Sequence, residues 1–157
     1  MLKLKIIVVD RTKSSFLKAG ESFYLERLRK YVQVEWVEVK PVKIKKGRLE
    51  EEILSKEGQA IARKLAPMDY IVPLDRSGHE FDSEGLATWL DNLSTSTGGW
   101  VSFIIGGPLG LSKELLDRAS KILSLSRLTM THEMSRLLLL EQLYRAFTIL
   151  RGEKYHK

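Results

Sequence analysis

The chain has 157 residues, of which 43% are hydrophobic and 29% charged, and it carries a formal net charge of +6 at pH 7. These values are typical of one globular domain, which we expect to span residues 1–157. The lack of cysteine excludes disulfides, thiolate metal sites and a cysteine nucleophile. The histidines are far apart and form no helical ligand pair, so we expect no metal.

Nothing at the start of the chain resembles a targeting segment. The opening MLKLKIIVVDR is too short and too interrupted by lysine for a signal peptide. No apolar run approaches the ~18 residues of a membrane helix. We therefore expect a cytoplasmic protein with no membrane partner.

The first elements alternate between strand and helix. Residues 3–9 and 32–39 are rich in β-branched side chains, which favours strands. Between them a helix is predicted, capped by Ser14 or Ser15. Its apolar residues share one face: Leu17, Tyr24, Leu28 and Tyr31.

A basic segment, KPVKIKKGR, follows the second predicted strand. Proline and glycine within it indicate a loop. A mobile loop of this charge suits the binding of RNA phosphates, but it equally suits a solvated connector. The high pI of about 9.5 favours nucleic acid. The candidate RNA-binding residues are Lys40, Lys43, Lys45, Lys46 and Arg48.

The middle of the chain continues the alternation. One helical face carries Leu49, Ile53, Ile61 and Leu65. The runs at 70–74 and 100–105 are short and apolar, as in buried parallel strands, and 125–130 is a weaker fifth strand. Helices at 83–93 and 113–123 follow serines placed as N-caps. The pattern predicts an α/β fold, a three-layer sandwich with a mainly parallel sheet.

The last predicted helix is apolar on every side. Four consecutive leucines, Leu137 to Leu140, exceed what one buried stripe requires. A helix buried within the chain is one interpretation. We favour a helix shared with a second copy in a homodimer, whose interface would bury Leu140, Tyr144 or Phe147.

A glycine-rich turn, FIIGGPLGLS, follows the fourth predicted strand. The GGxxG spacing does not match dinucleotide-binding turns, and Lys113 follows Ser112 in the wrong order for a phosphate loop. Pro108 also removes a backbone donor. An adenosine-type ligand without phosphates fits better than pyrophosphate, and a purely structural turn fits equally well.

Three stretches together resemble the RlmH family of SPOUT methyltransferases: FIIGGPLGLS, LSLSRLTMTHEMSRLLLLEQLYRAF and the terminal RGEKYHK. The resemblance implies a C-terminal trefoil knot, an obligate homodimer and S-adenosylmethionine as cofactor. It also implies methylation of N3 of a pseudouridine in a stem-loop of 23S ribosomal RNA, free or in the ribosome. Carried over by position, the cofactor residues are Leu74, Gly106, Leu125, Ser126, Arg127, Leu128, Thr129 and Met130.

Tyr155 and His156 would otherwise be assigned to a frayed terminus, but the resemblance makes them catalytic candidates. Arg136 is a third candidate, which would hold the base or a phosphate in position. His132 is a second histidine candidate, although it suits the start of a helix better. Thr131 replaces a proline that many relatives carry, and we expect a looser turn there. Two alternatives stay open: another SPOUT activity, on the ribose 2′-O or on tRNA, and a non-catalytic RNA-binding assembly factor.

Overall fold

The computed structural model describes residues 2–157, and its centre is a parallel sheet with the strand order β2-β1-β4-β3-β5. Every pairing between these strands is parallel, which confirms the predicted sheet. The strands span β1 (Lys3–Val9), β2 (Gln33–Val39), β3 (Tyr70–Glu80), β4 (Val101–Ile105) and β5 (Leu123–Ser124).

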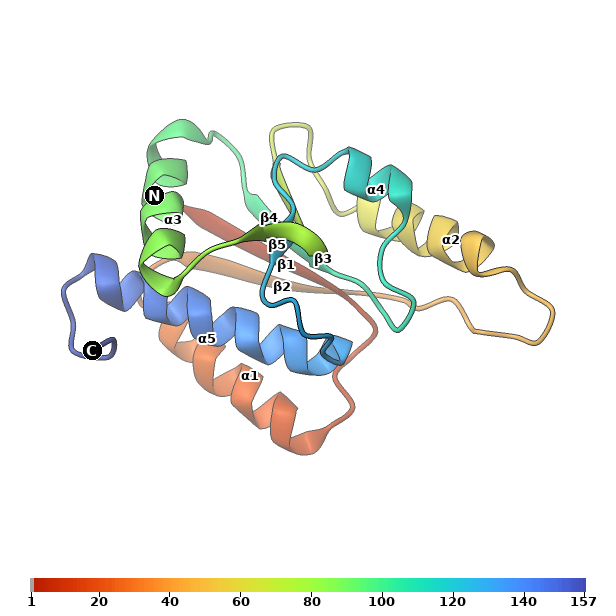
Figure 1. Cartoon of the computed structure of the whole chain (residues 1–157), viewed down its shortest axis with the longest axis horizontal. Helices are drawn as coiled ribbons and strands as arrows, with labels where there is room; N and C mark the ends of the chain where they lie inside the picture. Colours follow the sequence, from red (N-terminus) through yellow and green to blue (C-terminus); the bar gives the residue numbers. More distant parts are fainter. Residues whose placement is uncertain (1) are drawn as a thin grey trace.

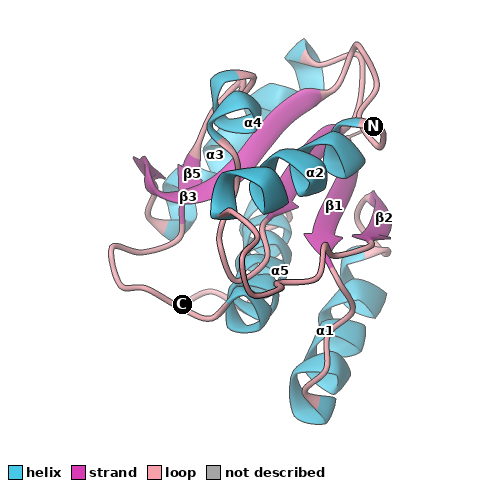
Figure 2. Cartoon of the chain, turned by 90° about the vertical axis from the view of Figure 1, so that its right-hand side faces the viewer, coloured by secondary structure: helices cyan, strands magenta, loops and turns pink. Residues whose placement is uncertain are grey.

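Helices cover both faces of the sheet, so the α/β sandwich has three layers (Figure 1). Helices α1 (Ser15–Leu28), α3 (Ser83–Ser96) and α5 (His132–Leu150) contribute to the larger core cluster, and α2 (Glu50–Ala62) and α4 (Lys113–Asp117) to the smaller one. Successive side chains of β1 point to opposite faces of the sheet, so Ile6 and Val8 join the larger cluster and Ile7 and Val9 the smaller one. Figure 2 shows α1 and α2 on opposite sides of β1.

Two predicted elements are wrong in extent. The helix expected over 113–123 ends at Asp117, because the N–H groups of Ser120 and Lys121 donate to the Ile71 carbonyl and draw the chain to the sheet. The strand expected over 125–130 is a loop, and the paired residues are 123 and 124. In that loop the Ser126 hydroxyl accepts a hydrogen bond from the Leu128 N–H at 3.0 Å, which closes a local turn in place of strand pairing.

The apolar side chains around α5 are covered by other elements of the same chain. It packs against both α1 and α3, and it contacts β4. Leu139, Leu140 and Leu143 are fully buried there, and Phe147 is buried too. Leu140 and Phe147 are therefore wrong as interface residues, since the protomer already encloses them.

A buried ion pair lies at the amino edge of the sheet, where β1 and β4 begin. Lys5 Nζ lies 3.2 Å from Asp69 Oδ2 and donates to the Lys64 carbonyl at 2.9 Å. The same carboxylate oxygen accepts from the Ala66 N–H and the Ser102 hydroxyl. Burial opposes ionisation of Asp69, but the Ala66 N–H and Lys5 outweigh it, so the pKa of Asp69 is lowered.

No helix within residues 2–157 is long and apolar enough to cross a membrane.

Candidate active site

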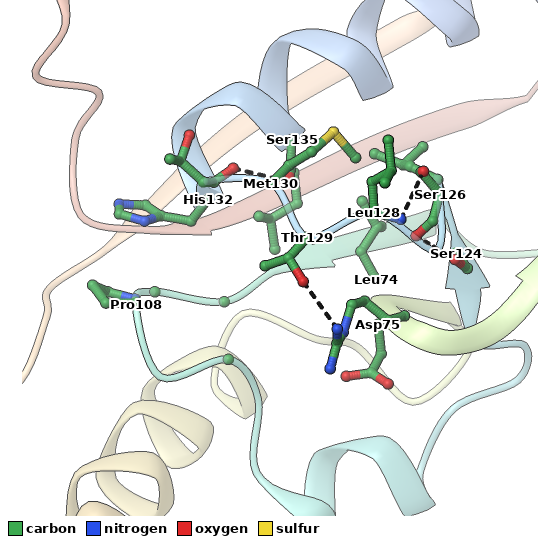
Figure 3. A pocket seen from close by; sticks show the side chains of 17 residues that line it. Leu74, Asp75, Pro108, Ser124, Ser126, Leu128, Thr129, Met130, His132 and Ser135 are labelled. Carbon is green, nitrogen blue, oxygen red and sulfur yellow. Dashed lines mark hydrogen bonds between the residues drawn. The ribbon is translucent and has the colours of Figure 1, made fainter.

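A cavity of about 450 Å³ opens at the carboxyl edge of the sheet, where β4 and β5 end beside the middle of β3 (Figure 3). Three chain segments far apart in sequence form its walls. They are the middle of β3 (74–76), the glycine-rich turn after β4 (105–110) and the stretch from β5 into α5 (124–135). Ligands of parallel sheets bind at this edge.

The glycine-rich turn is a tight reversal. The Gly110 N–H donates to the Gly107 carbonyl at 3.0 Å, with Pro108 at the turn position that favours proline. Gly110 has a φ of +83°, which side chains rarely adopt. A Cβ on Gly106 would collide with the Gly110 carbonyl. Gly106 is thus required by the turn itself, which was one of the two interpretations that the sequence left open.

The segment 125–131 is held in place by side-chain hydrogen bonds. Arg76 donates to the Thr129 hydroxyl at 2.9 Å and so ties the segment to β3. The Thr131 hydroxyl accepts from the Met134 N–H at 3.1 Å and caps α5. Thr131 thus starts α5 with a standard helix cap, and the looser turn expected there stays a prediction.

Seven of the eight predicted cofactor residues line this one cavity: Leu74, Gly106, Leu125, Ser126, Leu128, Thr129 and Met130. Arg127 does not line it, and its exposed guanidinium lies 3.9 Å from Glu80. Leu128 is 76% exposed at the rim, which excludes plain core packing. Sequence reasoning missed Asp75, Arg76, Ser124 and Ser135, whose positions depend on how the three segments meet.

His132 is the first residue of α5, as its sequence context suggested, and it lines the cavity. In Figure 3 it lies with Pro108 at one end of the cavity, away from Ser124 and Ser126. Burial and the nearby Arg136 lower the pKa of His132. Its imidazole is accordingly neutral at pH 7.

Arg136 is fully buried beneath the site. It donates to the Val9 carbonyl at 2.6 Å and to the Thr12 hydroxyl at 2.9 Å, and Thr12 donates to Glu21. Its Nε has no hydrogen-bond partner within the described part of the chain. The predicted contact with base or phosphate does not fit this position. Arg136 instead fixes the loop after β1 against the first turns of α5.

The C-terminal tail folds back on α5. Tyr155 donates to Glu141 Oε1 at 3.1 Å, and His156 Nδ1 lies 3.1 Å from an Arg145 nitrogen. Arg145 in turn donates to Glu141 at 2.6 Å. Burial and the Glu141 carboxylate raise the pKa of Tyr155, so its hydroxyl stays protonated at neutral pH.

Figure 1 shows that the C-terminal tail lies at the far end of α5 from the first turn of the helix, which lines the cavity. The helix has 19 residues from His132 to Leu150, a length of about 28 Å. Tyr155 and His156 follow its last turn, whereas the cavity adjoins its first. The structure therefore does not bring the predicted catalytic tail to the predicted cofactor site within one chain.

The basic residues occupy the loop between β2 and α2, as predicted. Lys40, Lys43, Lys45 and Lys46 are exposed and Arg48 is half-buried. The loop lies at the same edge of the sheet as the cavity (Figure 1). Across residues 2–157, no three His, Asp or Glu side chains are grouped to hold a metal ion.

Comparison with known proteins assigns the class. Residues 2–156 match the family described as "Predicted SPOUT methyltransferase". A probable methylase family protein from Haemophilus influenzae has a similar fold, with a TM-score of 0.57 and 15% identity over 100% of this chain and 72% of that one. A probable methyltransferase from Bordetella pertussis gives the same TM-score and identity over 93% of this chain and 96% of that one. The chain belongs to the SPOUT methyltransferases.

Closer relatives define the branch of that family. The chain is 42% identical to ribosomal RNA large subunit methyltransferase H of Halothermothrix orenii, over 99% of this chain and all of that protein. It is 44% identical to the protein of the same name from Moorella thermoacetica, over the full length of both. The resemblance to the RlmH family is confirmed.

Proposed function

We propose that this protein transfers a methyl group from S-adenosylmethionine to N3 of a pseudouridine in a stem-loop of 23S ribosomal RNA, in the cytoplasm. The observation that supports this most is the cavity at the carboxyl edge. Two of its three walls, the glycine-rich turn and the stretch from β5 into α5, lie in segments that carry the family resemblance, in a chain 42–44% identical to large subunit methyltransferase H proteins.

The cavity suits the cofactor. Its volume of about 450 Å³ lies in the range of small-molecule sites. Leu74, Leu125 and Met130 offer apolar surface to adenine, and the backbone of residues 125–130 offers hydrogen-bonding groups. The sulfonium of S-adenosylmethionine supplies an electrophilic methyl group. The task left to the chain is to orient the base and to accept its proton.

We propose that the complete site requires a homodimer. The tail at the far end of α5 would then serve the cavity of the second copy. Apolar side chains left exposed on α1 and α5 support a further interface: Phe16 (69% exposed), Phe23 (45%) and Leu138 (37%). Tyr155, with its protonated hydroxyl, would donate a hydrogen bond to the substrate, and His156 would handle the proton.

The trefoil knot belongs to the same proposal. Strand β5 pairs with β3 at both Leu74 and His79, and the stretch from β5 into α5 then lines one cavity together with β3 and the glycine-rich turn. This course fits the threading of the last segment through an earlier loop. The knot would hold the cavity walls together without a separate cofactor domain.

The test is methyl transfer from labelled S-adenosylmethionine to a 23S stem-loop, to the large subunit and to whole ribosomes, followed by mass spectrometry of the modified nucleoside. We expect N3-methylpseudouridine. A 2′-O-methyl nucleoside or a tRNA product would indicate another SPOUT activity. Calorimetry that detects no binding of S-adenosylmethionine would instead indicate a non-catalytic assembly factor.

A further inference from the structure

A second cavity, of about 270 Å³, adjoins the first. Pro108 and His132 line both cavities, so the glycine-rich turn and the start of α5 separate them. The second cavity lies where β1 ends, under the basic loop and against α2. Its volume suits a single pyrimidine nucleoside and is too small for a base pair.

Glu57 of α2 supplies the second cavity with an uncommitted hydrogen-bond acceptor. The residue is only 6% exposed. Its Oε2 accepts from the Val42 N–H at 3.2 Å, and no group within residues 2–157 donates to Oε1. That second oxygen lies under the glycine-rich turn, 3.8 Å from where a Cβ on Gly107 would stand. Burial raises the pKa of Glu57, with only the Val42 N–H opposing it.

The other acidic side chains around the second cavity already have partners. Asp10 lies 3.3 Å from Lys13 Nζ. Glu133 accepts from the N–H groups of Lys13 and Ser14 at 3.1 and 3.0 Å. Glu133 is only half-buried, whereas the Glu57 side chain is buried and still leaves Oε1 accessible and without a donor, so Glu57 differs from these acids.

The remaining walls suit a flat base with phosphate beside it. Val42, Ile53 and Leu109 provide apolar surface. Lys43 lines the cavity from the basic loop, where it can neutralise a phosphate. A base that is to be modified has to leave its stack and enter a pocket of this kind.

We propose that the second cavity receives the flipped-out pseudouridine and that Glu57 Oε1 accepts its N1–H. Pseudouridine carries this donor because its ribose is joined through carbon, whereas the N1 of uridine is occupied by the ribose. Since N1 and N3 flank the same carbonyl of the ring, N1–H on Glu57 leaves N3 free to face the first cavity. Glu57 is then the residue that distinguishes pseudouridine from uridine.

This inference rests on the proposed function and is tested by substrate preference. The probes are two RNA stem-loops that differ only in carrying pseudouridine or uridine at the acceptor position. For the wild-type protein we expect kcat/KM to favour pseudouridine by roughly 10- to 100-fold, the effect of one hydrogen bond to a charged group. The variant Glu57→Gln keeps an oxygen for the Val42 N–H and turns an amide donor toward N1–H. Its preference should fall to about one, with S-adenosylmethionine affinity unchanged.

Glu51→Gln, on the exposed face of α2, is the matched control and should keep the preference. Val42→Phe fills the second cavity and should abolish transfer to both RNAs, whereas Leu49→Phe, 70% exposed at the start of α2, should not. A folded Glu57→Gln that keeps the preference, or a Val42→Phe that methylates normally, would overturn the inference alone. Absence of RNA methylation by the wild-type protein would overturn the proposed function itself.

Discussion

Charged groups are paired at the amino edge of the sheet, whereas an acceptor is left unpaired at the carboxyl edge. At the amino edge, Lys5 and Asp69 are buried together, and each makes further hydrogen bonds to backbone or side chains. At the carboxyl edge, Glu57 keeps a free oxygen, Leu128 is exposed and two cavities meet at Pro108 and His132. Paired charges stabilise a fold, whereas unpaired acceptors and open apolar surface are ready for a ligand. Variants at the two edges should therefore separate stability from binding.

The largest effect is expected at the amino edge. Lys5→Met leaves the Asp69 carboxylate buried without its ammonium partner and should lower the free energy of unfolding by about 3–5 kcal/mol. The control is Lys113→Met, whose partner Asp117 is also 3.2 Å away but exposed, and which should cost under about 1 kcal/mol. Urea denaturation measures both. Equal losses would show that burial does not determine how much an ion pair contributes to the free energy of unfolding.

The buried Lys5–Asp69 pair should also make the free energy of unfolding depend on pH. Because the folded pKa of Asp69 is lowered, its stabilising contribution is complete above the unfolded value of about 3.9 and is lost as the pH falls through the folded value. Asp69→Asn removes this contribution. The difference in unfolding free energy between wild type and Asp69→Asn should thus shrink between pH 7 and pH 3. A difference that stays constant over this range would contradict the assignment.

At the carboxyl edge, Ser135→Phe should weaken binding of S-adenosylmethionine by roughly 100-fold, because the ring fills the first cavity. The control is Ser22→Phe on α1. In both residues the hydroxyl donates to the carbonyl four residues earlier, but Ser22 is exposed and remote from the cavity. Calorimetry compares the two affinities, and thermal unfolding checks that both variants fold. Ser135→Phe with wild-type affinity would mean that the cofactor binds elsewhere.

The smallest effect is expected from the basic loop. Replacing Lys43, Lys45 and Lys46 by alanine should weaken RNA binding by about tenfold and flatten its salt dependence, while cofactor affinity stays the same. Lys18, Lys30 and Lys64, exposed on other parts of the surface, form the control triple. Filter binding at several salt concentrations gives the slope. An unchanged slope would make the loop a solvated connector.

The sequence predicted the parallel sheet because β-branched and apolar runs mark strands that are covered on both faces. It could not predict where α4 ends, since the Ile71 carbonyl that draws Ser120 to the sheet is 49 residues away. Leu74, Gly106 and Met130 were found through family resemblance, and the structure brings them to one cavity. Glu57 was missed because a glutamate in an amphipathic helix resembles any solvated one. Only the fold reveals that α2 turns it inward.

Arg136 shows the opposite error. It was predicted, together with the tail residues, to contact the base or a phosphate, but its hydrogen bonds to Val9 and Thr12 place it inside the protomer. The excess of leucine in α5 was similarly assigned to a second copy, although α1 and α3 already bury Leu139 and Leu140. Composition indicates that a face needs covering, but the covering element is set by topology.

The central claim is that the first cavity of one copy works with the tail of another, and mixing two inactive variants tests it most directly. Ser135→Phe has a blocked cavity and an intact tail, whereas a chain lacking residues 155–157 has an intact cavity and no tail. At an S-adenosylmethionine concentration near the wild-type Kd, each alone should be almost inactive in methyl transfer. After unfolding and refolding together in equal amounts, random pairing should restore about a quarter of wild-type activity, because half the dimers contain one complete site of two. No recovery, with mixed dimers shown to form by mass spectrometry, would contradict the claim.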